Sequence, residues 1–193
     1  MAVRRPTRRE AEDAVRTLIC WAGDDPNRAG IVSTPSRVLG SLRERLSGYG
    51  EGSGHEVKWE FEGASDGAIV VVREIQFVSQ CEHHMMPFVG QADIAYLPAE
   101  RMAAEKSLHE VVTLFARRLQ SQERLTAEIL AAIDDALRPR GTAILVQSEH
   151  LCMTARGVRA HGSTTVTMKF SGALRGSKEA EVLDRLLANG KRT

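Results

Sequence analysis

Two short clusters of side chains that can bind metal lie far apart in the sequence. The first is Cys81-Glu82-His83-His84, and the second, Ser148-Glu149-His150-Leu151-Cys152, follows about seventy residues later. Thiolates and imidazoles are natural ligands of zinc. A cysteine and a histidine of the first cluster with the cysteine of the second give three ligands and leave a position for water, as in catalytic zinc sites. A closed structural zinc site and a buried Cys/His cluster are the alternatives.

The composition sets limits on the class of protein. The chain has 193 residues, of which 42% are hydrophobic and 26% charged, and a formal net charge of +1. This length suits one domain with a helical extension. The near-neutral charge gives no basic field for nucleic acid, and no apolar run is long enough to cross a membrane. The basic N-terminus leads into an amphipathic pattern, so we expect a cytoplasmic protein without a nucleic-acid or membrane partner.

The cysteine count argues against a disulfide framework. The chain has three cysteines, an odd and small number without a secretion signal. Two belong to the clusters. The third, Cys20, lies in a helical pattern, and we expect it to be a buried small hydrophobic residue.

Two helices are predicted near the N-terminus. Thr7 and Glu10 form a Thr-x-x-Glu capping box that opens the first, and Gly23 follows its end. Thr34 as N-cap and Pro35 in the first turn open the second.

Strands and helices alternate in the rest of the chain, and both clusters lie at strand ends. β-Branched residues and alternating patterns predict strands at 57–61, 68–79, 88–97, 142–147 and 161–172. Residues 107–137 form the longest helical pattern, with a break near Ser121 and the polar Gln122 on its apolar face. Ser177 is expected to cap a short final helix.

Three motifs in order carry a family resemblance. They are Cys81 to His84 with Pro87-Phe88, the run from Phe115 to Thr126, and His150 to Met153 with Arg156-Gly157-Val158. Together they resemble GTP cyclohydrolase I from about Ala14 to Leu187.

The resemblance implies an α+β architecture called the tunnelling fold. That fold is a four-stranded antiparallel sheet with two helices between its second and third strands, and family members assemble into a homodecamer. Residues 1–50 would be an N-terminal helical extension, and residues 51–193 the tunnelling-fold catalytic domain with its C-terminal helix. Active sites in the family lie at subunit interfaces.

The resemblance also implies roles for the cluster residues. It matches Cys81, His84 and Cys152 to ligands of Zn²⁺, and His83 and His150 to catalytic histidines. A bound zinc lowers the pKa of water from about 15.7 toward about 7, which supplies a nucleophile for the C8 carbon of a purine. Histidine, with a pKa of about 6.5, can give and take the protons that opening the imidazole ring requires. We assign purine protonation to His150 and proton transfer at the ribose or formyl side to His83.

Substrate-binding residues follow from the same resemblance. Gln122 and Glu123 match positions that recognise the guanine edge, where a carboxylate accepts from both N1–H and the exocyclic amine. Arg156 and Arg37 match positions that contact the triphosphate, for which the planar guanidinium is suited. Ordinary surface charge is the alternative for Glu123 and both arginines.

One segment departs from the family pattern. The family has Gly-Leu-Ser-Lys and then Arg, whereas this chain has Ala104-Glu105-Lys106-Ser107 and then Glu110, and Gly40 replaces a further basic residue. A hydrogen bond to a charged group contributes roughly 1.5–3 kcal/mol, so losing two weakens binding about a hundredfold or more. Lys106 is the remaining candidate for phosphate binding in this segment.

Three functions therefore stay open. The first is the family reaction, in which GTP and water give 7,8-dihydroneopterin triphosphate and formate. The second is hydrolysis of a purine base or nucleoside without a triphosphate, of the guanine or 8-oxoguanine type. The third is a zinc-bound assembly or regulatory subunit without activity.

Overall fold

The chain divides into two units, Met1–Leu46 and Ser47–Thr193, in a computed structural model that describes residues 4–49, 57–64 and 67–176. The first unit contains helices α1 (Arg8–Trp21) and α2 (Thr34–Arg45). None of the described helices is long and apolar enough to span a membrane. The predicted final helix from Ser177 lies outside the described residues.

The N-terminal helices begin close to where the sequence predicts. The Thr7 hydroxyl accepts a hydrogen bond from the Glu10 amide at 3.2 Å, and the Thr7 amide donates to the Glu10 carboxylate at 2.7 Å, which confirms the capping box. The N-cap of α2 is Ser33, one residue before the predicted Thr34, and a proline stands in its first turn as predicted.

The prediction for Cys20 is wrong, because its side chain is exposed. No residue of α1 is buried, and the side chain of Trp21 in the same turn is 85% exposed. The physical reason is size: a unit of two short helices has too little interior to cover both apolar faces.

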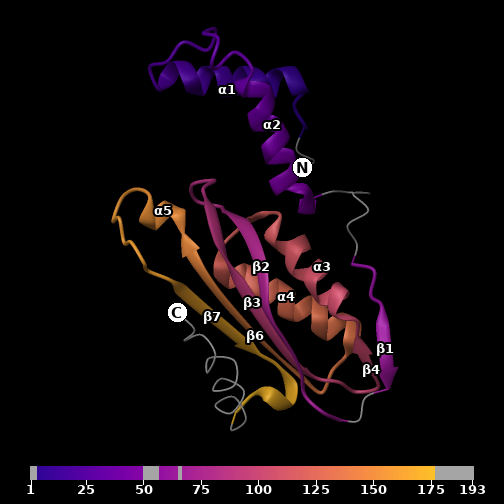
Figure 1. The fold of residues 1–193 in the computed structure, drawn as a ribbon. Helices are drawn as coiled ribbons and strands as arrows, with labels where there is room; N and C mark the ends of the chain where they lie inside the picture. The colour runs from indigo at the N-terminus through magenta and orange to yellow at the C-terminus, as the bar shows by residue number, and fades with distance from the viewer. Residues whose placement is uncertain (1–3, 50–56, 65–66, 177–193) are drawn as a thin grey trace. The chain divides into compact units, whose positions relative to one another are not determined.

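The second unit is built on a five-stranded sheet in the order β5-β2-β3-β6-β7 (Figure 1). Its four long strands are antiparallel neighbours, and the short β5 pairs in parallel with β2. The strand bounds are β2 (Val70–Cys81), β3 (Pro87–Leu97), β5 (Leu119–Gln120), β6 (Gly141–His150) and β7 (Thr165–Phe170).

Helices α3 (Glu105–Ala116) and α4 (Gln122–Leu137) follow β3 and precede β6, and both cover the same face of the sheet (Figure 1). The main core lies between them and the sheet, and includes Ile75, Phe88, Leu108, Ile129 and Val146. This element order is that of the predicted tunnelling fold, and the α+β prediction is confirmed.

The predicted break in the long helical pattern is also confirmed. α3 ends at Ala116, and the Ser121 hydroxyl then caps α4 by accepting from the Arg124 amide at 3.2 Å. Between the two helices, β5 pairs Gln120 with Cys81, so the break ties the helical layer to the cysteine end of β2.

A small second sheet pairs β1 (Phe61–Ala64) with β4 (Arg101–Ala103). The prediction of a strand over 57–61 is therefore wrong, because the strand begins at Phe61, where the predicted one ends. Val57 and Trp59 pack against the main core instead. A run of alternating residues can serve as either a strand or an extended connection, and only the partner backbone decides.

Candidate metal centre and active site

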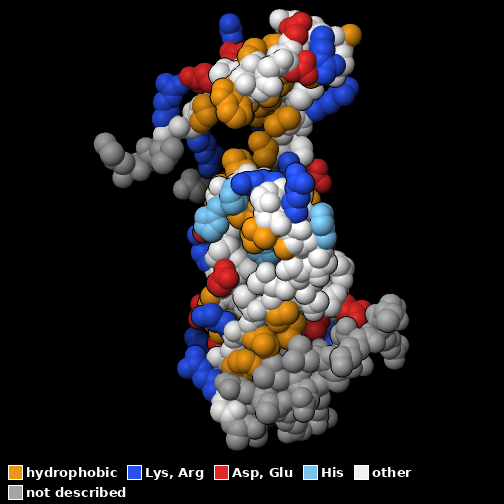
Figure 2. All heavy atoms as spheres, turned by 90° about the vertical axis from the view of Figure 1, so that its left-hand side faces the viewer, with side chains coloured by type: hydrophobic (Ala, Val, Ile, Leu, Met, Phe, Trp, Pro, Cys, Tyr) orange, Lys and Arg blue, Asp and Glu red, His pale blue; other side chains and the backbone are white. Residues whose placement is uncertain are grey.

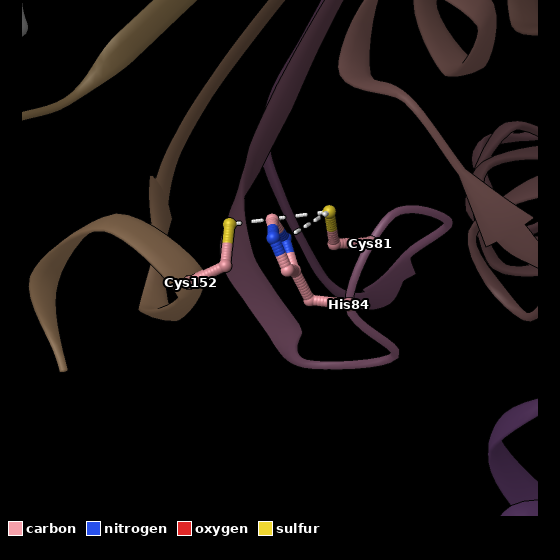
Figure 3. A group of neighbouring side chains, drawn as sticks. All are labelled: Cys81, His84 and Cys152. Atoms are coloured by element: carbon pink, nitrogen blue, oxygen red, sulfur yellow. Dashed lines mark hydrogen bonds between the residues drawn. The ribbon is translucent and has the colours of Figure 1, made fainter. Parts of the chain in front are cut away.

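Cys81, His84 and Cys152 point toward one another (Figure 3), although they come from three different local structures. Their candidate ligand atoms all lie within 4.8 Å of one another. The Cys81 sulfur is 3.9 Å from the His84 Nδ1 and 3.9 Å from the Cys152 sulfur. Both cysteines are buried, whereas His84 is exposed, so the cluster lies at the edge of the core and open to one side.

The connection from β2 to β3 brings His84 back to Cys81. The Cys81 amide donates to the Met86 carbonyl at 2.8 Å, and the Met85 amide donates to the Cys81 carbonyl at 2.8 Å. Met85 adopts a positive φ of 53°, which closes the turn. Cys81 is the last residue of β2, so the first ligand is held by the sheet and the second by this turn.

Strand pairing delivers the third ligand. β6 runs antiparallel to β3, with Phe88 opposite His150 in the register. The helix α5 (Leu151–Thr154) begins directly after β6 and carries Cys152. β2 and β6 both run antiparallel to the strand between them, β3. Their C-terminal ends, which carry the two clusters, therefore lie at the same end of the sheet.

The donor set fits a divalent cation such as zinc. Two sulfurs bound at about 2.3 Å in a tetrahedral site stand about 3.8 Å apart, which matches the observed 3.9 Å. Burial, followed by the neighbouring Cys81 sulfur, raises the pKa of the Cys152 thiol. A cation would reverse this preference, because a coordinated thiol is deprotonated.

His83 is not part of the candidate three-ligand group found among the described residues. Its Nδ1 also lies 3.9 Å from the Cys81 sulfur. However, only His84 combines with both cysteines in the candidate cluster. The His83 side chain is 70% exposed, and its Nε2 lies 3.9 Å from the Glu82 carboxylate. His83 is thus free of the ligand set and adjacent to it.

His150 is held between an aromatic ring and an amide. Its ring stacks on Phe88 with centroids 4.8 Å apart and an interplanar angle of 8°. Its Nε2 lies 2.8 Å from the Gln122 Oε1. Burial lowers the pKa of His150, and the negative charge of Glu123 opposes that effect.

Gln122 is buried, with 1% of its surface exposed, and every polar atom of its amide has a partner. Its Nε2 lies 3.0 Å from the carbonyls of Val146 and Thr165 and 3.2 Å from the Thr167 hydroxyl. Its Oε1 accepts from the Ser148 hydroxyl at 2.7 Å, besides its contact with His150. Sequence reasoning expected this amide at the guanine edge, whereas its partners here are protein groups.

The rim of the cluster is polar and charged. Figure 2 shows histidine side chains gathered at the end of the sheet unit where α5 lies, with Lys and Arg side chains next to them. Exposed histidines of the described chain include His83, His84 and His161. Arg124 pairs with Glu82 at 3.0 Å and so ties the α4 N-terminus to the loop that carries His83.

The three residues expected to bind phosphate lie in separate parts of the sequence. Arg156 follows α5 and is exposed, and its charge reaches Cys152. Arg37 lies in α2, in the other unit, and is exposed. Lys106 lies in the first turn of α3, which follows β4 in the sequence. β4 and α5 lie at opposite ends of the main sheet (Figure 1).

The first turn of α3 is occupied by local contacts. The Lys106 ammonium lies 3.3 Å from the Glu60 carboxylate and 3.7 Å from that of Glu110. Ser107 is buried: its hydroxyl accepts from the Glu60 amide at 3.0 Å and donates to the Lys58 carbonyl at 3.3 Å. Ser107 therefore holds the chain before β1 against α3.

Two contacts of this site were not foreseen from the sequence. Phe88 was noted only as part of a motif, and its stacking on His150 follows from the β3–β6 register. Ser148 was noted only as part of the second cluster, and its bond to Gln122 depends on the packing of α4 on β6. The one available signal was a polar Gln122 on an otherwise apolar helix face.

The chain is similar to known proteins of one family over most of its length. The family model described as GTP cyclohydrolase I matches residues 11–186. The GTP cyclohydrolase 1 of Sinorhizobium fredii strain NGR234 is 48% identical over 172 residues, covering 89% of this chain and 84% of that protein. The GTP cyclohydrolase 1 of Hyphomonas neptunium is 46% identical over 189 residues, covering 96% and 90%. Among solved structures, the archaeosine synthase QueF-Like in the apo form aligns with a TM-score of 0.48 at 16% identity, covering 56% of this chain and 98% of that one.

Proposed function

The chain belongs to the GTP cyclohydrolase I family, and we propose that it is a zinc-dependent hydrolase that opens the imidazole ring of a guanine-type purine at C8. In the family reaction, GTP and water give 7,8-dihydroneopterin triphosphate and formate. The observation that carries this proposal is the convergence of Cys81, His84 and Cys152, with His150 as the N-cap of the helix that carries Cys152.

Cys81, His84 and Cys152 would hold the zinc, with the exposed side of the cluster left for water and substrate. A bound zinc supplies water of lowered pKa near neutral pH. The chain's own contribution is to fix two thiols on the sheet and a short helix, so that the ligand atoms are close before the cation binds.

His150 is proposed to protonate a ring nitrogen of the purine. The stacked Phe88 fixes the plane of the imidazole, which a proton donor needs for a defined direction. His83, exposed and next to the Cys81 sulfur, is proposed to transfer protons on the ribose or formyl side. The two histidines flank the cluster, one from each sequence motif.

Glu123 is proposed to recognise the guanine edge. It is exposed in the first turn of α4, and its charge reaches His150. A carboxylate there accepts from both N1–H and the exocyclic amine of guanine, whereas adenine has no N1–H. Gln122 is not included in this role, because its amide is engaged by protein groups.

A second candidate, a purine base or nucleoside without a triphosphate, is favoured by the first turn of α3. In the resemblance, this turn supplies Ser, Lys and Arg to the triphosphate. Here Lys106 is paired with two carboxylates and Ser107 is used to hold the chain before β1. Glu110 and Glu60 would repel a triphosphate.

The family's ring assembly is part of the proposal. β7 is an edge of the described sheet, with the exposed side chains of Val166 and Met168 on it. An exposed edge with apolar side chains is suited to pairing with another copy of the chain. Active sites in the family lie at subunit interfaces, so Arg37 and Lys106 remain proposed substrate contacts.

A substrate series tests the proposal. The zinc-loaded protein is incubated with GTP, GMP, guanosine, guanine and 8-oxoguanine, and formate and pterin products are measured. Turnover of GTP above the others supports the family reaction, and turnover only of compounds without phosphate supports the second candidate. If the protein binds zinc and assembles but turns over none of them, it is a subunit without this activity and the proposal fails.

A further inference from the structure

We propose that Gln122 is a positioning residue that holds the neutral His150 ring in the tautomer with its proton on Nε2. The nitrogen with a free lone pair is then Nδ1, so it is the position at which the ring takes up a proton before passing that proton to the substrate. Only this last step rests on the proposed function. The tautomer itself follows from hydrogen bonds within the chain.

The orientation of the Gln122 amide is fixed by two backbone carbonyls. The atoms that lie 3.0 Å from one end of this amide are the carbonyl oxygens of Val146 and Thr165. A carbonyl oxygen only accepts hydrogen bonds, so the NH₂ group must face both of them. Turning the amide over would place an oxygen against two oxygens in a buried site. The usual ambiguity of amide orientation is therefore absent here.

The other end of the amide then fixes the imidazole. The Gln122 Oε1 has no hydrogen and accepts from the Ser148 hydroxyl at 2.7 Å. The His150 Nε2 lies 2.8 Å from the same oxygen, so it must carry a hydrogen to form a bond. In the opposite tautomer, the lone pair of the His150 Nε2 would face the Gln122 Oε1, and two acceptors would repel each other. Gln122 is only 1% exposed, so no water can lie between them.

The amide is held from several directions, so it cannot turn to follow the imidazole. The Thr167 hydroxyl lies 3.2 Å from its nitrogen and 2.7 Å from the Thr126 hydroxyl. The Thr126 hydroxyl in turn donates to the backbone carbonyl of Gln122 at 2.8 Å. On the other side of His150, the Phe88 ring holds the imidazole plane at an interplanar angle of 8°. A rigid oxygen and a fixed plane leave one orientation and one tautomer for the ring.

The tautomer can be observed directly in the assembled, zinc-loaded protein without substrate. The probe is ¹⁵N-labelled histidine, measured by magic-angle-spinning NMR, with a His150→Gln sample to assign the signals. We expect His150 to show a protonated Nε2 and an unprotonated Nδ1. In Gln122→Met, which has a similar volume and no hydrogen-bonding oxygen, we expect a mixture of tautomers. A proton on Nδ1 in the unmodified protein, or an unchanged tautomer in Q122M, would overturn the proposal.

A matched control separates tautomer control from a general loss of packing. Gln120 is a second fully buried glutamine, and its amide bonds the Phe115 carbonyl, Glu128 and Arg124 but not His150. Gln120→Met removes a comparable set of bonds, and we expect the His150 signals to stay as in the unmodified protein. If Q120M changes the tautomer as much as Q122M does, Gln122 has no specific effect.

Kinetics with the preferred substrate then distinguish positioning from base recognition. A positioning role predicts that Q122M lowers kcat by roughly a hundredfold, the usual contribution of one acid–base group, with KM changed less than about threefold. A role at the guanine edge predicts the reverse, a raised KM with kcat retained, and would contradict the proposal. Because the NMR measurement needs no turnover, failure of the proposed function leaves the tautomer assignment testable.

Discussion

The sulfur atoms of Cys81 and Cys152 lie 3.9 Å apart, although the two residues are separated by 71 positions in the sequence. A disulfide requires about 2.05 Å between sulfurs, so the two cysteines are not bonded to each other in this structure. The spacing is close to the roughly 3.8 Å expected for two ligands of one tetrahedral zinc. The arrangement of three strands that produces this distance therefore also produces the candidate metal centre.

Removal of one cysteine ligand should abolish tight zinc binding. Losing a residue that only hydrogen-bonds to a metal ligand weakens metal binding about tenfold to a hundredfold. We expect Cys152→Ser, which removes a ligand itself, to weaken zinc binding by at least that much. Competition with a coloured chelator measures the affinity. Cys20→Ser is the matched control, because Cys20 is exposed and lies outside the cluster. Equal zinc affinity in the two variants would rule out the assigned site.

Freeing Lys106 should test whether α3 contacts phosphate. The double variant Glu60→Gln/Glu110→Gln removes both carboxylates that pair with Lys106. If a triphosphate binds at this turn, KM for GTP falls, whereas KM for guanosine stays the same. Glu105→Gln is the control, since Glu105 faces His109 on the same helix. An unchanged KM for GTP in the double variant would remove Lys106 from the substrate contacts.

Ser107 should contribute to stability and not to catalysis. Its buried hydroxyl serves the Glu60 amide and the Lys58 carbonyl, and Ser107→Ala leaves the amide without this partner. The expected loss is about 1–3 kcal/mol in the free energy of unfolding, measured by urea denaturation. Ser163→Ala, at an exposed position, should change it by less than about 0.5 kcal/mol. A large fall in kcat for S107A without a loss of stability would contradict this assignment.

The stacking of Phe88 on His150 should matter for turnover. We expect Phe88→Leu to lower kcat by about tenfold or more, because a small displacement of a catalytic group is costly. Phe77→Leu provides the comparison: the Phe77 ring meets Phe88 edge-on, with centroids 5.9 Å apart. Both variants should lose about 0.5–3 kcal/mol of stability. A similar fall in kcat for both would mean that the ring acts only through core packing.

The contribution of Asp93 to the free energy of unfolding should fall as the pH rises. Burial raises its pKa, and its bond from the Glu74 amide and the charge of Arg73 oppose that effect. The folded protein therefore binds this proton more tightly than the unfolded chain, so the contribution of Asp93 to stability falls as pH rises from about 4 through the raised value. Asp93→Asn keeps an oxygen for the Glu74 amide and does not titrate.

Urea denaturation of both proteins across the acidic range measures this effect. The stability of D93N relative to the unmodified protein should increase with pH through that window and become constant above it. Curves that stay parallel from about pH 4 upward would show that the folded and unfolded states share one pKa for Asp93.

Local signals in the sequence were enough for several elements. The capping box at Thr7 and the break at Ser121 depend on side chains within three or four residues of the helix start, so no distant partner is needed. The long strands followed from β-branched and alternating runs, and their order agrees with the fold class that the family resemblance implied. The three candidate ligands could be named because thiolates and imidazoles are the usual zinc ligands and occur in two short clusters.

Other features depended on contacts between distant segments. Cys20 was placed in a core that its own two-helix unit cannot form. The distances of the His84 imidazole to the two cysteines depend on the turn at Met85, which only the folded chain shows. The engagement of Lys106 required Glu60, a residue far away in sequence and next to it in space.

By itself, the sequence determined which chemical groups the protein carries and which elements hold them, because residue type and local spacing act over a few positions. The tertiary structure decided which groups are in contact and which of their hydrogen-bonding positions are already occupied. Gln122 is the clearest case: its residue type suits recognition of a base, but the packing of α4 on β6 and β7 directs its amide to the Val146 carbonyl, the Thr165 carbonyl and His150. A side-chain amide has few hydrogen-bonding positions, and only the folded neighbourhood determines which partners take them.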